Sequence, residues 1–143
     1  MIFQRLEIPD VILITPDIFG DPRGFFFETF HYEKFKENGL SINIVQLNHS
    51  GSIRHTLRGL HYQSNHTQGK LVRAVKGVIY DVAVDLRKSS DYFGKWVGVQ
   101  LDEDNKQQLW VPPGFAHGFL VLSDWAEIIY CATDVYDPAS EHT

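Results

Sequence analysis

The chain has 143 residues with a hydrophobic fraction of 43% and an aromatic fraction of 13%, which excludes intrinsic disorder and predicts one packed domain over residues 1–143. Its formal net charge of -5 excludes a general nucleic-acid binder, because such affinity comes from many Lys and Arg contacts with phosphates. The longest early apolar run, Val11–Ile14, is too short for a signal peptide or a membrane span. We therefore expect a cytoplasmic protein without a nucleic-acid or membrane partner.

The segment from Gly20 to Phe30, GDPRGFFFETF, combines turn residues with Arg23, three consecutive phenylalanines and Glu28. A planar guanidinium beside exposed aromatic rings suits a nucleotide, with the Arg on a phosphate and a ring on the base. The other interpretation is a strand packed by its phenylalanines, with Arg23 on the surface. The next segment, residues 31–38, predicts a short helix that ends at Gly39.

Positive charge is concentrated in the middle of this acidic chain. Residues 38–80 contain no Asp or Glu, but five Lys or Arg and four His. A compact basic segment of this kind suits a small anion. Within it, Gln46 and Asn48 alternate on a predicted strand, where their amides suit a base or a sugar and equally suit an edge position.

Alternation of apolar and polar residues, with frequent turn residues, dominates the rest of the chain and predicts many short strands. The clearest predicted strands are residues 70–75, 78–86, 96–101, 109–111, 119–122 and 127–133. Short strands with little helix predict an all-β fold, a β-barrel or β-sandwich of the jelly-roll type with a concave pocket inside.

His61 and Lys70 lie on neighbouring predicted strands, so a hairpin can set both side chains on one face. Arg58 has the opposite parity to His61. Both can face a pocket only if the strand bulges between them, and Gly59 is the residue that allows a bulge. The competing interpretations are a core histidine at position 61 and a solvated edge lysine at position 70.

The segment PPGFAHGF holds Pro112, Gly114 and His117 in the spacing of the second motif of the cupin superfamily. In metal-binding cupins this histidine is a ligand, together with a first motif that here reads HYQ at residues 61–63. Lys70 follows where a carboxylate ligand is wanted. Because an ammonium group repels a divalent cation, we expect a cupin-like barrel without a metal.

The last predicted strand carries Tyr130 and Cys131, and Tyr136 follows it closely. A buried phenol needs a hydrogen-bond partner, so each tyrosine can be either a core residue or a proton donor. The single cysteine excludes an intrachain disulfide, and we interpret it as a small buried thiol.

Seven ordered motifs together resemble the dTDP-4-dehydrorhamnose 3,5-epimerase family. They are RGLHYQ, QGKLVR, DVAVDLR, FGKWVGV, NKQQLW, PPGFAHGFLVLS and AEIIYCATDVYDP, and the resemblance extends from about Phe3 to Glu141. It implies a cupin-like jelly roll that works as a homodimer without a metal or organic cofactor. The implied reaction inverts C3 and C5, which flank the 4-keto group of a dTDP-linked deoxysugar, through enolate intermediates in dTDP-rhamnose biosynthesis.

The resemblance also implies roles for individual residues, and an enolate mechanism needs these roles filled. His61 matches the family's base, Lys70 the group that stabilises the enolate oxygen, and Tyr130 the acid that reprotonates the opposite face of the sugar. The positions that match nucleotide, diphosphate and sugar binding are Arg23, Glu28, Gln46, Asn48, Arg58, His117 and Glu141.

The chain departs from the family's pattern at its C-terminus. Family members continue for a few tens of residues beyond DVYDPASE, and their tail carries an Asp that pairs with the catalytic histidine. An orienting carboxylate fixes the tautomer of an imidazole and raises its basicity. We therefore expect a slower base here, unless Asp81 or Asp85 points inward and replaces that carboxylate.

Three other functions compete with epimerisation at two carbons. A relative with the same pocket could invert one carbon or move the keto group between C3 and C4. Retention of His61 and Tyr130 favours epimerisation, because inversion needs a donor opposite the base. A non-catalytic nucleotide-sugar binder is the second alternative, favoured by the short C-terminus, and a metal-dependent cupin oxygenase is the third.

Overall fold

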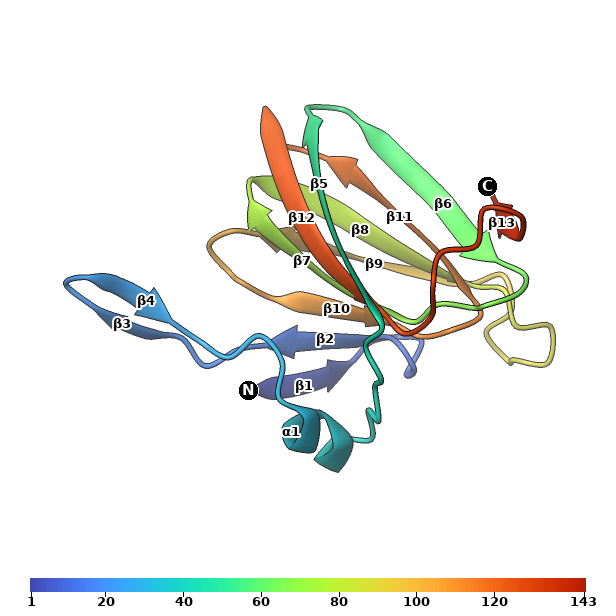
Figure 1. Cartoon of the computed structure of the whole chain (residues 1–143), viewed down its shortest axis with the longest axis horizontal. Coiled ribbons are helices and arrows are strands. Elements are labelled where there is room, and N and C mark those ends of the chain that lie inside the picture. Colours follow the sequence, from blue (N-terminus) through green and yellow to red (C-terminus); the bar gives the residue numbers. More distant parts are fainter.

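The alternating segments form two antiparallel sheets that pack face to face (Figure 1). The computed structural model describes residues 1–143. In chain order the elements are β1 (Ile2–Arg5), β2 (Ile12–Thr15), β3 (Phe19–Asp21), β4 (Gly24–Phe26), α1 (Tyr32–Glu37), β5 (Gln46–Ile53), β6 (Leu57–Gln63), β7 (Lys70–Lys76), β8 (Val78–Asp85), β9 (Trp96–Asp102), β10 (Gln108–Val111), β11 (Phe115–Val121), β12 (Trp125–Ala132) and β13 (Glu141–His142).

The strand order of the two sheets is that of a jelly roll rather than of a simple meander. Sheet I has the order β1-β2-β10-β7-β12-β5, and sheet II has the order β13-β6-β11-β8-β9. Apolar side chains from both inner faces, such as Val72 and Ile128 from sheet I and Ile79 and Phe119 from sheet II, form the main core. The predicted all-β, cupin-like jelly roll is confirmed.

A second, smaller core lies on the outer face of sheet I. Helix α1 begins after His31, whose side chain accepts a hydrogen bond from the Lys34 backbone, and it buries Phe35 against Ile12 and Trp110. Gly39, at φ 84°, follows the helix end, as predicted. The six residues of α1 form the only helix, and it is too short to cross a membrane.

Strands β3 and β4 form a hairpin that projects away from the two packed sheets (Figure 1). Its aromatic side chains Phe19, Phe25 and Phe26 are each more than 60% exposed. The interpretation of this segment as a packed strand is therefore wrong within a single chain, although the surface position expected for Arg23 is correct.

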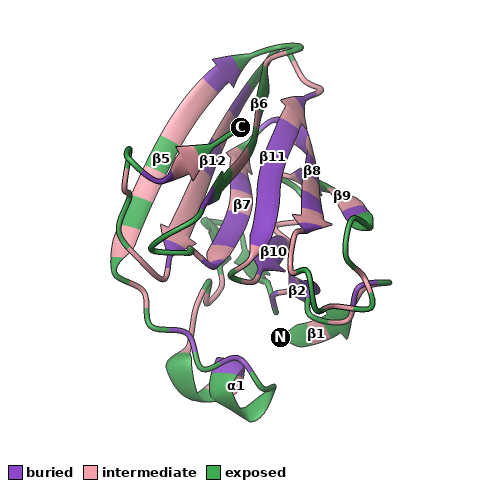
Figure 2. Ribbon diagram, turned by 90° about the vertical axis from the view of Figure 1, so that its right-hand side faces the viewer, coloured by how far each residue is buried: buried purple, intermediate pink, exposed green.

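The predicted strands are confirmed within one or two residues, except for β11. That strand begins at Phe115 rather than at residue 119, so His117 lies inside it. Six of its seven residues are buried, and Figure 2 shows β11 as a mostly buried central strand. A strand covered on both faces shows no alternation of apolar and polar residues, so the sequence pattern did not identify the first half of β11.

Strand β8 turns two carboxylates into the protein interior. Its burial alternates strictly, with Ile79, Asp81, Ala83 and Asp85 on the buried face. Burial alone raises the pKa of Asp85, but hydrogen bonds from Arg87 and Ser90 outweigh it and lower the pKa from 3.8 to about 2. Arg87 also pairs with Asp10, so this cluster fixes the end of β8.

We predict that Asp85→Asn lowers the free energy of unfolding at pH 7 by roughly 2 kcal/mol. The folded-state pKa lies below the unfolded one, so this contribution is present above about pH 4 and is lost as the pH falls toward 2. Urea unfolding at pH 7 and at pH 3 measures it. Asp91→Asn, on the exposed loop after β8, is the control, and an equal loss in both variants would contradict the assignment.

Candidate active site

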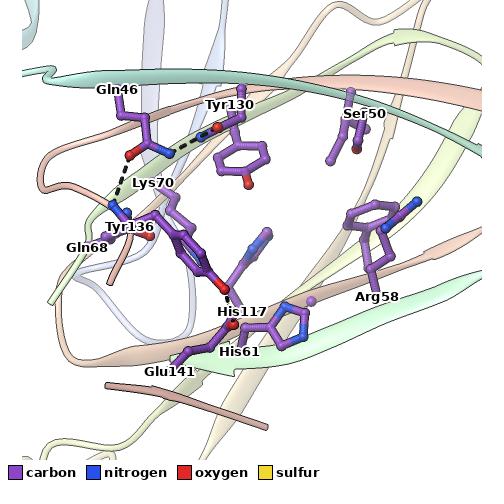
Figure 3. Close-up of a pocket in the computed structure, with 14 residues that line it drawn as sticks. Gln46, Ser50, Arg58, His61, Gln68, Lys70, His117, Tyr130, Tyr136 and Glu141 are labelled. Carbon is purple, nitrogen blue, oxygen red and sulfur yellow. Dashed lines mark hydrogen bonds between the residues drawn. The ribbon is translucent and has the colours of Figure 1, made fainter. Parts of the chain in front are cut away.

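A cavity of about 310 Å³ opens between the two sheets, and Figure 3 shows the side chains that surround it. Sheet I contributes Gln46, Asn48, Ser50, Lys70, Ile128 and Tyr130, sheet II contributes Arg58, His61, His117, Gly118, Phe119 and Glu141, and the connecting segments contribute Gln68 and Tyr136. Most of these residues are polar, which suits a polar ligand with a few orienting contacts.

His61 and Tyr130 project into the cavity from opposite walls (Figure 3). His61 lies on β6 of sheet II and is half-buried, whereas Tyr130 lies on β12 of sheet I. Burial raises the pKa of the Tyr130 phenol, and Glu141 raises it further, while Arg58 lowers it. Tyr130 therefore holds its proton at neutral pH and can donate it to a group that His61 has deprotonated from the other side.

A bulge in β6 brings Arg58 and His61 to the same wall. His61 pairs with His117 of β11, and Arg58 pairs with Phe119. The two pairs are therefore three residues apart along β6 but only two residues apart along β11. Gly59, at φ 103°, occupies the bulge, and an added Cβ would lie 2.6 Å from the His117 carbonyl oxygen. The predicted bulge at Gly59 is confirmed, as is the prediction that His61 and Lys70 face one pocket.

We predict that Gly59→Ala lowers the free energy of unfolding by about 2–4 kcal/mol and also abolishes ligand binding, because the clash displaces the wall that holds Arg58 and His61. Gly94→Ala is the control, because Gly94 has a positive φ with no atom near its Cβ position and should cost only about 1 kcal/mol. Thermal unfolding and dTDP titration measure both effects. Equal losses in the two variants would contradict the role of the close contact.

Lys70 is a half-buried cation without an ion-pair partner. Burial lowers the pKa of its ammonium group, and the nearby carboxylates of Glu141 and Asp81 act in the opposite direction. Its Nζ also lies 6.0 Å from the centroid of the Tyr130 ring. An unpaired ammonium inside a cavity is available to an oxygen of a ligand that develops negative charge.

Arg58 supplies the second cation of the cavity. Its Nε donates a 2.9 Å hydrogen bond to the hydroxyl of the buried Ser52, which leaves the two terminal nitrogens of the guanidinium free. A planar guanidinium fixed in this way suits a phosphate or another anion. The prediction that the basic middle segment forms an anion-binding wall is consistent with this geometry.

His117 is paired with a buried carboxylate rather than exposed as a metal ligand. Its Nε2 lies 2.5 Å from Oδ1 of Asp81, which is fully buried. The sequence left open whether Asp81 or Asp85 points inward and replaces the carboxylate partner of His61. Both side chains point inward, but neither bonds to His61. The geometry of the strands explains this, because Asp81 reaches the neighbouring strand β11 and Asp85 is held by Arg87.

A C-terminal strap closes one end of the cavity. The Tyr136 hydroxyl donates a 2.6 Å hydrogen bond to Glu141, and the Tyr136 backbone donates to the side chain of Gln46, as Figure 3 shows. Gln63, which is buried under the strap, donates to the Val135 carbonyl and accepts from the Asp137 backbone. These contacts attach residues 135–141 to β6 and carry Tyr136 and Glu141 to the cavity.

Two predicted binding residues do not reach this cavity. Arg23 lies at the tip of the projecting hairpin, where its side chain is 90% exposed and pairs with Asp21 at 2.6 Å. Glu28 accepts a hydrogen bond from Lys34 at the base of the hairpin. Neither residue lines the cavity of its own chain, because the hairpin points away from the sheets, and their role in binding stays a prediction.

Sequence reasoning missed several lining residues. Ser50 continues the alternation of Gln46 and Asn48 along β5, so the same pattern could have found it. Gln68 lies in an irregular segment, where no alternation of apolar and polar residues points to a cavity.

Throughout the structure, no group of three or more His, Cys, Asp or Glu side chains is placed to hold a metal ion. Cys131, predicted as a small buried thiol, is half-buried on β12, and burial raises its pKa.

The fold and the cavity define a cupin-like jelly roll with a histidine and a tyrosine on opposite walls of a polar cavity. Comparison with known sequences then identifies the family. The chain belongs to the dTDP-4-dehydrorhamnose 3,5-epimerase family, whose sequence profile matches residues 5–143.

Individual relatives agree with this assignment. The chain is 56% identical over 138 residues to a dTDP-4-dehydrorhamnose 3,5-epimerase of Pseudomonas aeruginosa, covering 96% of this chain and 76% of that protein. The structure of a Legionella pneumophila dTDP-6-deoxy-D-glucose-3,5-epimerase in complex with dTDP-4-keto-L-rhamnose superposes with a TM-score of 0.96, at 49% identity, covering 99% of this chain and 76% of that chain. A dTDP-4-dehydrorhamnose 3-epimerase of Streptomyces niveus is 38% identical over 144 residues, covering 99% of this chain and 70% of that protein.

Proposed function

We propose that the protein inverts C3 and C5 of dTDP-4-dehydro-6-deoxy-D-glucose to give dTDP-4-dehydro-L-rhamnose. The observation that carries this proposal is the placement of His61 and Tyr130 on opposite walls of one cavity. Inversion at a carbon requires that a proton leaves from one face and arrives at the other. A base and an acid on opposite sides of the ligand satisfy this requirement.

The chemistry follows from the acidity of hydrogens beside a carbonyl. His61 removes the proton from C3, and the electron pair of that bond moves into the C3–C4 bond, which leaves negative charge on the C4 oxygen. The Lys70 ammonium stabilises this enolate oxygen in the cavity. Tyr130 then donates its proton to the opposite face of C3, and the C4 carbonyl forms again. Exchange with solvent returns a proton to Tyr130 and removes one from His61, after which C5 reacts in the same way.

The remaining lining residues bind the nucleotide part of the substrate. The free terminal nitrogens of Arg58 suit the diphosphate, and the imidazole of His117 lies on the same wall. Gln46, Asn48 and Glu141 offer amide and carboxylate groups to the sugar and base. No step of this reaction uses a metal or an organic cofactor. The cytoplasmic location stays a prediction.

Arg23 and Glu28 take part in binding only if a second copy of the chain is present. We propose a homodimer in which the hairpin of β3 and β4 reaches the cavity of the partner subunit. The exposed aromatic side chains of the hairpin support this proposal, because an apolar surface of this kind is covered in a stable assembly. The outer face of β5 supports it as well, since Leu47 and Ile53 are both exposed there.

Mixing two inactive variants tests this arrangement. Arg23→Ala removes the contribution of the hairpin and His61→Ala removes the base, so each homodimer should be nearly inactive. If the hairpin acts on the partner's cavity, random mixing should restore about a quarter of the wild-type activity, because half of the dimers are mixed and one of their two sites is intact. Reassembly after denaturation, with an assay of epimerisation, measures this. Failure of the mixture to regain activity would contradict the proposal.

Isotope exchange separates the roles of His61 and Tyr130. In deuterated water, His61→Ala should lose exchange at C3 and C5 by more than a hundredfold, because no base remains to remove a proton. Tyr130→Phe should keep exchange but lose inversion, since reprotonation can then come only from the side of the base. Proton NMR follows both processes. In each variant, dTDP affinity should stay within about threefold of wild type, because the phosphate contacts lie elsewhere.

The opposite pattern would contradict these assignments. If exchange persisted without His61, another group would be the base. If dTDP affinity fell as far as activity in His61→Ala, the imidazole would be a binding group.

Epimerisation at C3 alone is the second candidate function. The 38% identical 3-epimerase supports it, because a protein with that name covers nearly the same residues. Both candidates use the same base and acid, and they differ only in whether C5 reacts. The stereochemistry of the product at C5 therefore distinguishes them.

A further inference from the structure

Asp81 is the one fully buried carboxylate beside the cavity, and the mechanism above gives it no role. It lies on the inner face of β8, between strands β9 and β11. Its Oδ1 is 2.5 Å from Nε2 of His117, while its Oδ2 is buried and has no hydrogen-bond partner. A buried carboxylate that is only half satisfied is costly, so its retention needs a functional explanation.

The contact with Asp81 determines which nitrogen of His117 faces the ligand. A carboxylate accepts hydrogen bonds, so the proton of His117 lies on Nε2. Neither Nδ1 of His117 nor Oδ2 of Asp81 has a hydrogen-bond partner in the protein. Oδ2 is buried, whereas Nδ1 is accessible to solvent. Since His117 lines the cavity, Nδ1 is the atom that meets the ligand. Protonation of the ligand-facing nitrogen then gives a cation whose other N–H is held by Asp81.

The charge of Asp81 also acts on Lys70. Burial lowers the pKa of Lys70, and the carboxylates of Glu141 and Asp81 raise it. Glu141 is bound to Tyr136 and lies at the solvent side of the cavity, whereas Asp81 is fully buried. A buried charge is screened less by salt and water than an exposed one. Asp81 is therefore a fixed, buried carboxylate beside His117, and its charge favours the ammonium form of Lys70.

We propose that Asp81 is a positioning residue of the epimerase: it holds His117 with Nδ1 directed at the substrate. This inference rests on the proposed function, since it places the substrate in this cavity. Asp81 touches neither the substrate nor the reacting atoms and acts through His117. It differs in this respect from Asp85, which lies on the same face of β8 and is bound by Arg87.

The test compares Asp81→Asn with Asp85→Asn in the full chain. For Asp81→Asn we expect kcat to fall about tenfold to a hundredfold, with KM changed less than threefold. Asp85→Asn removes a buried carboxylate from the same strand and should leave kcat and KM unchanged. An unchanged kcat in Asp81→Asn would overturn the proposal. If wild type itself shows no exchange of the sugar hydrogens, the proposed function fails instead.

A second measurement decides the matter even if Asp81→Asn does not fold. Nitrogen-15 NMR of histidine-labelled wild type, with the His117 signals identified by their loss in His117→Gln, reports which ring nitrogen carries the proton. We expect the proton on Nε2 in the free protein and a change at Nδ1 alone when dTDP-sugar is added. A neutral His117 with its proton on Nδ1 would overturn the proposal, because Asp81 could not then accept the hydrogen bond.

Discussion

The close approach of β6 and β11 is the constraint on which the cavity depends. Gly59 lies against the backbone of β11, and a Cβ on Gly118 would lie 2.6 Å from the carbonyl oxygen of Arg58. Two glycines facing each other allow the strands to meet at a bulge, and the bulge changes the parity of β6. Arg58 and His61 consequently enter the same cavity. Without this contact Arg58 and His61 would lie on opposite faces of sheet II.

Burial in this cavity has opposite consequences for Tyr130 and Lys70, the two groups that the proposed mechanism places beside the enolate. It favours the neutral form of each, which suits Tyr130 because an acid must hold its proton until it is needed. The same effect works against Lys70, which must stay charged to stabilise an oxyanion. Carboxylates near Lys70 offset part of that effect. The carboxylates of Glu141 and Asp81 therefore contribute to the chemistry of the cavity, because they favour the charged form of Lys70.

Much of the fold and part of the site could be predicted from the sequence. Alternation of apolar and polar residues identified most strands of the two sheets, and the parity of Arg58 and His61 identified the bulge at Gly59. Strand β11 was predicted to begin four residues too late, because a strand buried on both faces has no alternation of apolar and polar residues. The pairing of Asp81 with His117 joins positions 36 residues apart, and no local pattern reports such a contact.

The direction of the hairpin that carries Arg23 could not be predicted for a related reason. Its turn residues and aromatic residues predict local structure, but they do not say whether those rings pack within the chain or against another molecule. The resemblance to a family supplied roles for Arg23 and Glu28 that a single chain cannot explain. Residues whose role depends on an assembly are therefore the ones for which sequence reasoning about one chain fails.

The stereochemistry of the product tests the central claim most directly. Purified 143-residue chain is mixed with dTDP-4-keto-6-deoxyglucose in deuterated water, and proton NMR follows the sugar signals. The account predicts loss of the C3 and C5 proton signals together with the appearance of the rhamno configuration. Binding of the nucleotide sugar with unchanged C3 and C5 signals would contradict it and would leave a binding protein with the fold of an epimerase.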